Sequence, residues 1–321
     1  MMYPSIKPVN NVQMTKPVEQ QQMSGQKGLV ISYFGNSVAV EAEDGQVFQC
    51  HLRRNQELPV VGDRVVWQLE TEESGVIMGI EPRRSLLARG DARGKSKPVA
   101  ANVDIIVLVM APPPIFSEYL LDRYLVAAEL LDIQPVLVLN KVDLLDPERR
   151  EEAAARLEPY RKIPYKSILS STYTREGLSD LEWCLKGKTA VLVGPSGVGK
   201  SSIISVLAGG HAIRTSEVSP KGAGKHTTTA TRLYHLPQGG QLIDSPGVRE
   251  FNLWAVSRQE VLRGFREFQA FLKGCKFRDC LHVVEPGCAV QEAVKNGNIS
   301  PGRYASYQQL MKEAEKQNKY S

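Results

Sequence analysis

The segment Gly194–Ser201 constrains the fold more than any other part of the chain, because its sequence, GPSGVGKS, matches the phosphate-binding pattern GxxxxGK[ST] at every position. The apolar run Ala190–Val193 precedes it, and Ser201–Leu207 follows it with the apolar spacing of a helix. Glycines in such a turn let backbone N–H groups point inward around phosphates, and the helix N-terminus adds a favourable dipole. The pattern predicts an α/β domain that binds a nucleoside triphosphate. The predicted phosphate-binding residues are Gly194, Pro195, Ser196, Gly197, Val198, Gly199, Lys200, Ser201 and Ser202.

The segment Asn140–Asp143, with the sequence NKVD, indicates which base is bound. It follows the apolar run Pro135–Leu139, so it should lie at the end of a buried strand. The Asp143 carboxylate can accept hydrogen bonds from N1–H and the exocyclic amino group of guanine, whereas adenine would leave it unpaired. Lys141 can lie along the base plane. The predicted base-binding residues are Asn140, Lys141, Val142 and Asp143, together with Ser171 and Thr172 after a short strand expected at 168–170.

Two further segments are candidates for the metal and γ-phosphate end of the site. Asp244–Gly247, with the sequence DSPG, follows an apolar run and supplies a carboxylate for Mg²⁺ and a glycine N–H for the γ-phosphate. Within His226–Thr229, either Thr228 or Thr229 would complete the Mg²⁺ shell before hydrolysis and release it afterwards. The alternative for this run is the start of a Thr-rich strand. Of the phosphate-binding loop residues, Lys200 would reach the β- and γ-phosphates and Ser201 would bind Mg²⁺.

The residue that follows the DSPG segment bears on the rate of hydrolysis. Many GTPases carry a glutamine at this position that orients the attacking water, whereas this chain has Val248. An apolar side chain cannot hold the attacking water, so we expect unassisted hydrolysis at about 10⁻⁴ s⁻¹ and a need for an activator. His226 is a candidate catalytic residue that such an activator would reposition, with an ordinary surface histidine as the alternative. The candidate catalytic residues are Lys200, Ser201, His226, Thr228, Thr229, Asp244 and Gly247.

Three cysteines and a histidine near the C-terminus have the spacing of metal ligands. Cys275, Cys280, His282 and Cys288 lie within fourteen residues, and a Cys₃His set favours a tetrahedral, structural Zn²⁺. The alternative is three buried cysteines and an unrelated histidine. The basic residues in and before this segment could contact either RNA phosphates or a docking protein. They are Lys276 and Arg278, with Arg258, Arg263 and Arg266 on a preceding helical stripe between 254 and 273.

Changes in composition and residue patterning divide the chain into five parts. Residues 1–25 lack apolar content and are expected to be a disordered tail. Residues 26–82 contain five short strand-like runs separated by turn signals, which predicts a small closed barrel resembling an OB-fold, or another docking barrel. Residues 83–102, with six basic residues and one acid between Arg83 and Lys97, are expected to be a basic linker, or else a loop that orders on a partner. Residues 103–250 and 251–321 are the nucleotide-binding and metal-binding domains, and the latter ends in a helix expected at Tyr304–Lys316.

Composition excludes several classes of protein. Apolar residues make up 42% of the 321 residues, and no run approaches the roughly 18 apolar residues of a membrane-spanning helix. The first residues lack the apolar core of a secretory signal. Five cysteines, three of them in one cluster, indicate a reducing compartment. These features predict a cytoplasmic protein without a membrane partner, and we expect a monomer.

The order of the motifs along the chain narrows the choice of protein family. In ordinary small GTPases the phosphate-binding loop comes first and the guanine-specificity motif comes near the end, whereas here NKVD precedes Gly194–Ser201. The chain is therefore a circular permutation of that fold. With its barrel and cysteine cluster it resembles, from about residue 28 to 295, the RsgA (YjeQ/YloQ-type) family of small ribosomal subunit biogenesis GTPases.

That resemblance implies a fold class and a function. The expected fold is α/β, a circularly permuted P-loop GTPase domain flanked by an N-terminal OB-like β-barrel and a C-terminal α-helical zinc-binding domain. The expected activity is hydrolysis of GTP to GDP in late maturation of the 30S subunit, with rRNA as partner and with Mg²⁺ and one Zn²⁺ as metals. Two alternatives are a P-loop kinase for a small molecule and an RNA-binding module that uses GTP only as a structural ligand.

Overall fold

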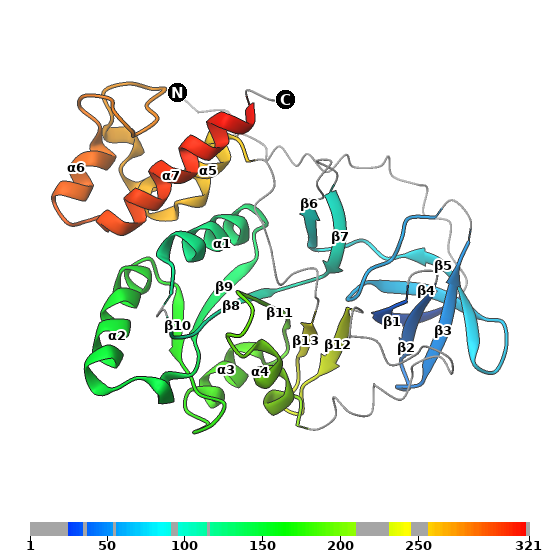
Figure 1. Cartoon of the computed structure of the whole chain (residues 1–321). Coiled ribbons are helices and arrows are strands. Elements are labelled where there is room, and N and C mark those ends of the chain that lie inside the picture. Colours follow the sequence, from blue (N-terminus) through cyan, green and yellow to red (C-terminus); the bar gives the residue numbers. More distant parts are fainter. Residues whose placement is uncertain are drawn as a thin grey trace.

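The computed structural model describes residues 25–34, 37–53, 56–90, 96–113, 116–209, 231–244 and 256–318. Figure 1 shows a β-barrel near the N-terminus, a central α/β domain and a helical C-terminal module that lies on the α/β domain. In the described part of the chain no helix is long and apolar enough to cross a membrane.

Five strands close into a barrel at the N-terminus. Their order is β1-β2-β3-β5-β4, and β4 pairs again with β1 to close the sheet. Alternate residues point inward, so that Val40, Trp67 and Ile77 are among the buried side chains of a small separate core. The predicted barrel is thus present. The strands are β1 (Gln26–Tyr33), β2 (Ser37–Ala42), β3 (Val47–Leu52), β4 (Arg64–Leu69) and β5 (Ser74–Ile80).

The α/β domain is built on a mainly parallel sheet in the order β10-β9-β8-β11-β13-β12, in which β12 is antiparallel to β13. Successive residues of β8 face opposite sides: Ile106 and Leu108 belong to one hydrophobic core, and Val107 to another. The strands are β8 (Ile105–Met110), β9 (Gln134–Leu139), β10 (Lys166–Leu169), β11 (Thr189–Val193), β12 (Arg232–His235) and β13 (Gln241–Asp244). The helices are α1 (Glu118–Leu130), α2 (Pro147–Lys162), α3 (Leu178–Leu185) and α4 (Lys200–Leu207).

Strand β12 was not expected from the sequence, and it joins the barrel to the α/β domain. It pairs with β1 through Ser32 and Arg232, so that the two sheets form one eleven-stranded sheet. The Ser32 hydroxyl also donates to the carbonyl of Thr231 at 3.2 Å. The barrel is therefore bonded to the strand that follows the threonine-bearing segment.

The segment interpreted as a basic linker contains two strands, β6 (Leu86–Gly90) and β7 (Ser96–Ala101), paired in an antiparallel sheet of their own. Its base is fixed to the barrel, because Arg83 pairs with the buried Asp63 at 2.7 Å and the Asn102 amide donates to the Gly62 carbonyl at 2.8 Å. A side chain at Gly62 would place its Cβ 2.3 Å from the Ala101 carbonyl oxygen. The segment is thus an ordered connection at this base, which the charge-rich sequence did not reveal.

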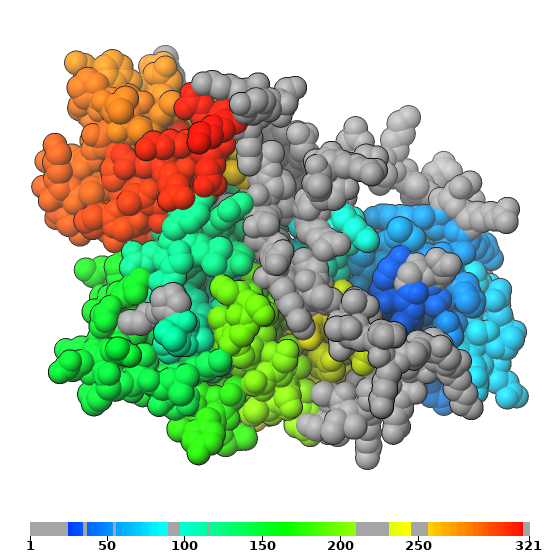
Figure 2. Space-filling model, in the orientation of Figure 1, coloured from blue at the N-terminus to red at the C-terminus, as the bar shows by residue number. Residues whose placement is uncertain are grey.

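The C-terminal module consists of α5 (Arg258–Gly264), α6 (Ala289–Lys295), α7 (Pro301–Asn318) and two short 3₁₀ helices (Arg266–Ala270 and Leu272–Gly274). The helical stripe expected over 254–273 is thus interrupted at Phe265. The final helix is longer than the expected Tyr304–Lys316, and its residues Tyr307, Leu310 and Met311 are buried. Figure 2 shows the orange and red residues of this module against the green α/β domain.

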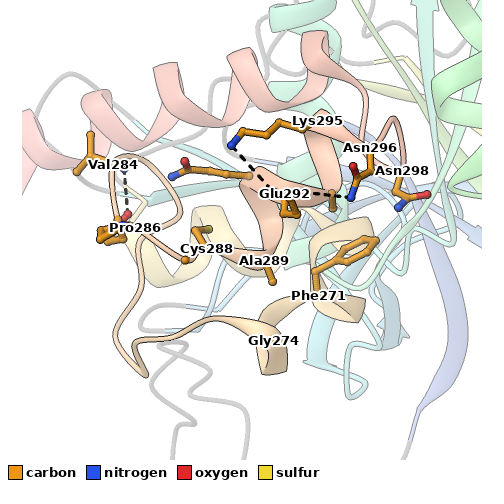
Figure 3. Close-up of a pocket in the computed structure, with 14 residues that line it drawn as sticks. Phe271, Gly274, Val284, Pro286, Cys288, Ala289, Glu292, Lys295, Asn296 and Asn298 are labelled. Atoms are coloured by element: carbon orange, nitrogen blue, oxygen red, sulfur yellow. Dashed lines mark hydrogen bonds and ion pairs between the residues drawn. The ribbon is translucent and has the colours of Figure 1, made fainter.

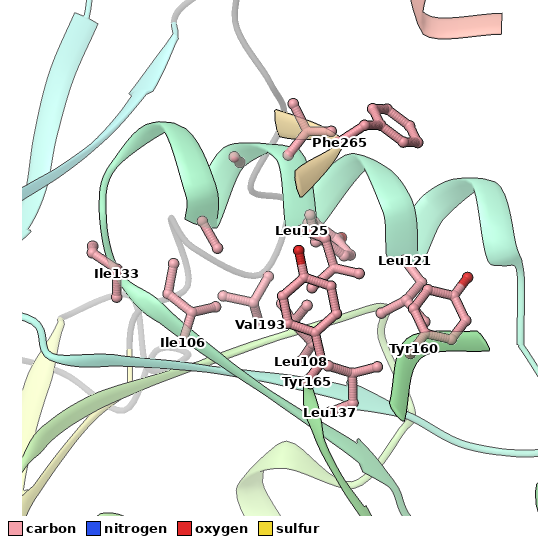
Figure 4. Packing of buried hydrophobic residues seen from close by; sticks show 14 of the residues in the cluster. Ile106, Leu108, Leu121, Leu125, Ile133, Leu137, Tyr160, Tyr165, Val193 and Phe265 are labelled. Atoms are coloured by element: carbon pink, nitrogen blue, oxygen red, sulfur yellow. The ribbon is translucent and has the colours of Figure 1, made fainter. Parts of the chain in front are cut away.

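Helix α1 lies between the sheet and the C-terminal module. Leu121 and Leu125 of α1 face Ile106 and Leu108 of the sheet in one core, and Phe265 reaches the same core from the C-terminal module (Figure 4). Gly264 of α5 packs so closely on Val126 that a Cβ there would lie 2.5 Å from it. The module and the α/β domain therefore share one hydrophobic core.

Candidate functional site

The phosphate-binding loop lies between β11 and α4, as the sequence predicts. Gly194 and Gly199 have φ angles of 146° and 96°. A Cβ at Gly194 would lie 2.1 Å from the Val109 carbonyl oxygen, and one at Gly199 would lie 2.4 Å from the amide nitrogen of Asn140. Glycine is therefore required at both positions by close approach as well as by backbone conformation.

Lys200 bends back over its own loop. Its ammonium group donates to the carbonyl oxygens of Gly194 and Pro195, both at 2.6 Å, and the residue is 7% exposed. Ser201 and Ser202, in the first turn of α4, are exposed. The loop thus holds a buried cation beside the helix N-terminus, which is an arrangement suited to an anionic ligand.

The NKVD segment is bonded directly to this loop. The buried Asn140 donates from its amide to the Val198 carbonyl at 2.9 Å, and the Lys141 ammonium donates to the Gly197 carbonyl at 2.7 Å. Asp143 is exposed in a short 3₁₀ turn, Val142–Leu144. The structure therefore brings together two motifs that are more than fifty residues apart in the sequence.

One residue of this region was not found from the sequence. The hydroxyl of the fully buried Ser170 donates to the side-chain oxygen of Asn140 at 3.2 Å and so fixes the amide orientation. Its only sequence signal is its place directly after β10. The predicted neighbour Ser171 instead organises its own turn, where its hydroxyl accepts N–H bonds from Tyr173 and Thr174 at 3.1 Å. Thr172 is half-buried beside it.

Asp244 is the last residue of β13, next to β11, and is half-buried. Parallel strands end at the same edge of a sheet, so it lies on the edge where the phosphate-binding loop begins. The predicted residues His226, Thr228, Thr229 and Gly247 lie outside the described residues, as does Val248.

An apolar cavity of about 460 Å³ adjoins the other side of the phosphate-binding loop. It is lined by Pro195 and Val198 of the loop, by Lys141, and by Phe116 and Leu121 at the start of α1. The loop and the helix that supports the C-terminal module therefore line the same cavity.

The four predicted metal ligands come together in the C-terminal module. Their donor atoms all lie within 4.8 Å of one another, and Nδ1 of His282 lies 3.4 Å from Sγ of Cys275 and 3.3 Å from Sγ of Cys288. A tetrahedral ion with metal–sulfur bonds of about 2.3 Å and metal–nitrogen bonds of about 2.0 Å needs S···N separations of about 3.5 Å. The donor set thus fits one such ion with no donor left over.

Protonation of these groups follows from their burial. Burial lowers the pKa of His282, which favours the neutral imidazole that ligates metals, and raises the pKa of the Cys280 thiol to about 12. A metal ion would therefore have to displace thiol protons, and its binding should weaken on acidification.

Other groups hold the ligand loop in shape. His282 has a left-handed backbone with φ of 59°, and its carbonyl accepts a hydrogen bond from the Tyr304 hydroxyl at 2.8 Å. The Tyr307 hydroxyl donates to the Leu281 carbonyl at 2.7 Å. The Glu285 carboxylate accepts bonds from three nearby backbone N–H groups at 2.9–3.0 Å. Burial alone would raise the pKa of Glu285, but these backbone bonds outweigh it and lower the pKa.

A cavity of about 530 Å³ lies beside the ligand loop, between Phe271, Pro286 and helix α6 (Figure 3). Within it, the Glu292 carboxylate is paired with Lys295 at 3.8 Å and receives the Asn296 amide at 3.5 Å. The cavity and the cysteine cluster share the wall formed by Cys288.

Comparisons with known proteins agree with this geometry. The family model for the RsgA GTPase matches residues 80–254. The "small ribosomal subunit biogenesis GTPase RsgA" of Pseudomonas aeruginosa is 50% identical over 287 residues, covering 89% of this chain and 85% of that protein. The protein of the same name from Dickeya dadantii is 45% identical over 300 residues, with 91% and 86% covered.

Solved structures show the same fold. YjeQ from Thermotoga maritima superposes with a TM-score of 0.74 and 34% identity, covering 90% of this chain and 98% of that one. YloQ, described as a circularly permuted GTPase, gives 0.72 and 32%, with 93% and 98% covered. The expected fold class, family and GTPase activity are confirmed. The chain belongs to the RsgA family of circularly permuted GTPases and is a GTP hydrolase.

Proposed function

We propose that this GTPase acts in late maturation of the 30S ribosomal subunit, in the cytoplasm and as a monomer, and that the subunit stimulates its hydrolysis of GTP. The observation that carries the proposal is the identity of 45% and 50%, over 91% and 89% of this chain, to proteins named small ribosomal subunit biogenesis GTPase. The hydrogen bonds from Asn140 and Lys141 to the phosphate-binding loop support a single site for base and phosphates.

In this site Asp143 accepts the two guanine N–H donors, and Lys141 lies along the base plane. When the nucleotide binds, the Lys200 ammonium exchanges its hydrogen bonds to the carbonyl oxygens of Gly194 and Pro195 for bonds to the β- and γ-phosphates, because a charged phosphate oxygen is the stronger acceptor. Mg²⁺ would be held by Ser201, Asp244 and either Thr228 or Thr229, where it would neutralise charge on the phosphates. The backbone N–H groups of the loop surround the phosphate oxygens.

The reaction is attack of water on the γ-phosphate, with loss of GDP. The chain contributes mainly positioning and charge stabilisation, because little covalent chemistry is needed. Val248 cannot orient the water, so unassisted turnover is slow. Binding of the subunit supplies the missing group or brings His226 into place.

The cysteine cluster holds one Zn²⁺ through Cys275, Cys280, His282 and Cys288 in a structural role. All four donors are needed to complete a tetrahedral shell, so no position is left for a water nucleophile. These four residues would hold the ion, which would then fix the loop that carries Lys276 and Arg278.

The contact with rRNA involves basic residues of the C-terminal module, by charge complementarity with phosphates. Lys276, Arg278 and Arg266 are exposed. Arg258 pairs with Glu315 at 3.1 Å and Arg263 donates to the Leu130 carbonyl at 3.2 Å, so these two also serve the packing of α5.

Cosedimentation with purified 30S subunits tests this partner. We expect the chain to sediment with 30S in the presence of a non-hydrolysable GTP analogue and much less with GDP. Binding should fall steeply between 50 and 200 mM salt, roughly the range over which phosphate contacts lose affinity. Equal recovery with 30S, 50S and no subunit would contradict the proposal. Membership of a family of GTP hydrolases argues against the alternative of an RNA-binding module that uses GTP only as a structural ligand.

A further inference from the structure

We infer that the loop between Cys275 and Cys280 is a stacking platform for an unpaired RNA base, with the Phe277 ring as the platform and Lys276 and Arg278 as the flanking phosphate contacts. This inference rests on the proposed function and deepens it, because it names the chemical feature of the RNA that the module binds.

Phe277 is unusual among the phenylalanines of its module. Its exposed fraction is 40%, whereas Phe265 and Phe268 in the same module are fully buried. The core beneath the module is already filled by a cluster of these buried rings with Tyr307, at centroid distances of 4.9–5.2 Å. Phe277 is therefore not needed to complete that core, and its ring is available to a partner.

The charges around Phe277 select an anionic partner. Lys273, Lys276 and Arg278 are exposed, and the only acid between residues 273 and 279 is Asp279. The Lys276 ammonium lies 5.6 Å from the centre of the Phe277 ring. An aromatic ring flanked by cations matches a nucleotide, whose base has a π-face and whose neighbours carry phosphates. The flexible stem of Lys276 lets its ammonium move from the ring to a phosphate.

The platform is anchored at its ends and next to the ring. Cys275 and Cys280, at the two ends of the loop, belong to the four-donor cluster, and the Lys276 N–H donates to the Gly287 carbonyl at 3.1 Å. A Cβ at Gly287 would lie 3.2 Å from Cβ of Lys276, so the two ligand loops are in contact. Little ordering is then required on binding, which favours affinity.

Unpaired bases, and not a duplex, are the feature that such a ring can bind. A base in a helix has its faces covered by its neighbours, whereas a base in a loop, bulge or junction can be stacked on a protein ring. Stacking tolerates any base, so the platform would select for structure more than for sequence.

The test compares the full-length chain with the variants Phe277→Ala and Phe277→Tyr for binding to 30S subunits at several salt concentrations. We expect Phe277→Ala to weaken binding by about 5- to 150-fold, the range measured for loss of one base–aromatic stack, with the salt slope unchanged. Phe277→Tyr should bind within a few-fold of wild type.

Lys276→Gln and Arg278→Gln should each lower the salt slope by about one. Metal content and basal GTP turnover should be equal in all variants.

Chemical probing of the rRNA in the same complexes identifies the contacted feature. At least one base protected by wild type should become reactive with Phe277→Ala and protected again with Phe277→Tyr. Unchanged affinity with Phe277→Ala would overturn the inference while leaving the proposed function in place. Weaker binding without any deprotected base would also overturn it and would indicate a protein contact. Failure of the wild-type chain to bind 30S would instead overturn the proposed function, and this inference with it.

Discussion

At the scale of single residues, two glycines of the same loop provide a matched test of the site. Gly199→Ala would place a Cβ 2.4 Å from the Asn140 amide nitrogen, whereas Gly197→Ala would meet no atom within 4 Å. Both glycines have positive φ, so both variants carry a backbone strain of about 1–3 kcal/mol, and only the first also displaces Asn140. We expect Gly199→Ala to bind GDP at least about 100-fold more weakly than Gly197→Ala, measured by titration with a fluorescent nucleotide, because it adds a clash to the strain. Equal affinities would contradict the role of Asn140.

Asp143 provides a test of base recognition. In Asp143→Asn the amide presents one donor where the carboxylate presented two acceptors, so one guanine N–H is left unpaired. We expect GTP affinity to fall by roughly 100- to 10,000-fold, by analogy with sites that reject a mismatched polar group. Xanthosine triphosphate has a carbonyl in place of the amino group and should recover much of the affinity in the variant. Competitive binding of the two nucleotides measures the switch, and a variant that still prefers GTP would argue against this role.

Residue-level prediction used local spacing to single out GPSGVGKS, NKVD and the four cysteine and histidine donors. The structure brings the first two segments into contact and, separately, gathers the four donor atoms within 4.8 Å of one another, while the roles of these residues stay predictions. It missed Ser170 because that residue acquires its role only when β10 lies beside β9 and its hydroxyl meets Asn140. The hydrogen bond from the Lys200 ammonium to the Gly194 carbonyl could not be predicted either, because no local sequence pattern encodes a side chain that turns back on its own loop.

At the scale of elements, α7 connects two parts of the molecule through neighbouring residues. Arg303 is fully buried and pairs with Asp122 of α1 and with Glu267, both at 2.8 Å, while Tyr304 and Tyr307 hold the metal-ligand loop. Arg303→Met would leave the Asp122 carboxylate buried without its cation. We expect the free energy of unfolding to fall by about 3–5 kcal/mol, measured by urea denaturation.

The exposed pair of Arg258 and Glu315 is the matched control for Arg303. Arg258→Met should cost less than about 1 kcal/mol, because exposed ion pairs contribute little. The double variant Arg303→Met with Asp122→Leu should recover part of the loss, since it removes the more deeply buried of the two carboxylates that lose their cation. If the two single variants lost similar amounts of unfolding free energy, the buried pair would not be what stabilises the packing of α7.

The tyrosines of α7 should set the affinity of the metal site. Tyr307→Phe removes the hydroxyl that holds the Leu281 carbonyl next to His282. We expect zinc to bind about 10- to 100-fold more weakly, as for other supporting contacts of metal ligands, in a competition with a chelator of known affinity. Tyr119→Phe is the control, because it also removes a tyrosine hydroxyl bond to α7, at Glu313, away from the metal ligands. Equal effects of the two variants would argue against a positioning role for Tyr307.

Element prediction depended on periodicity. Strand β11 and helix α4 match the predicted runs Ala190–Val193 and Ser201–Leu207 to within one residue, because apolar runs and helical spacing are strong local signals. Strand β12 was missed because the four residues RLYH show no clear alternation, and its pairing with β1 and β13 determines its structure. The strands β6 and β7 were missed because charge density favoured a linker, whereas pairing and the anchored base order the segment.

At the scale of the whole molecule, an ion pair connects the barrel to the α/β domain. His235 of β12 and Glu41 of β2 lie 2.7 Å apart, and the hydrogen bond to Glu41 raises the pKa of His235 above its usual 6.5 despite partial burial. A raised histidine pKa adds stability below about pH 6.5, and this contribution disappears as pH rises through the folded-state pKa.

We therefore expect His235→Gln to be less stable than wild type at pH 5.5, by less than about 1 kcal/mol because the pair is partly exposed, and equal to it at pH 9. Chemical denaturation of both proteins at the two pH values measures the difference. A difference that grows with pH would have the wrong sign for this pair.

The permuted order has a mechanical consequence for the whole chain. Asp244–Gly247, which would contact the γ-phosphate, precedes the C-terminal module in the sequence, and α1 packs against that module and lines the cavity beside the phosphate-binding loop. The barrel is bonded to β12 on the other side. We expect nucleotide state to be transmitted to the barrel and to the C-terminal module, with hydrogen exchange over 256–295 slower in the GTP-analogue form than in the empty form. Equal exchange in both forms would contradict this coupling.

GTP turnover with and without purified 30S subunits tests the central claim most directly, with ATP and the Asp143→Asn variant as controls. We expect slow turnover of GTP by the chain alone, near 10⁻⁴ s⁻¹ in order of magnitude, and a large increase with 30S. ATP should give no increase, and the variant should lose it. A rate of GTP hydrolysis that 30S subunits leave unchanged would contradict a subunit-activated GTPase.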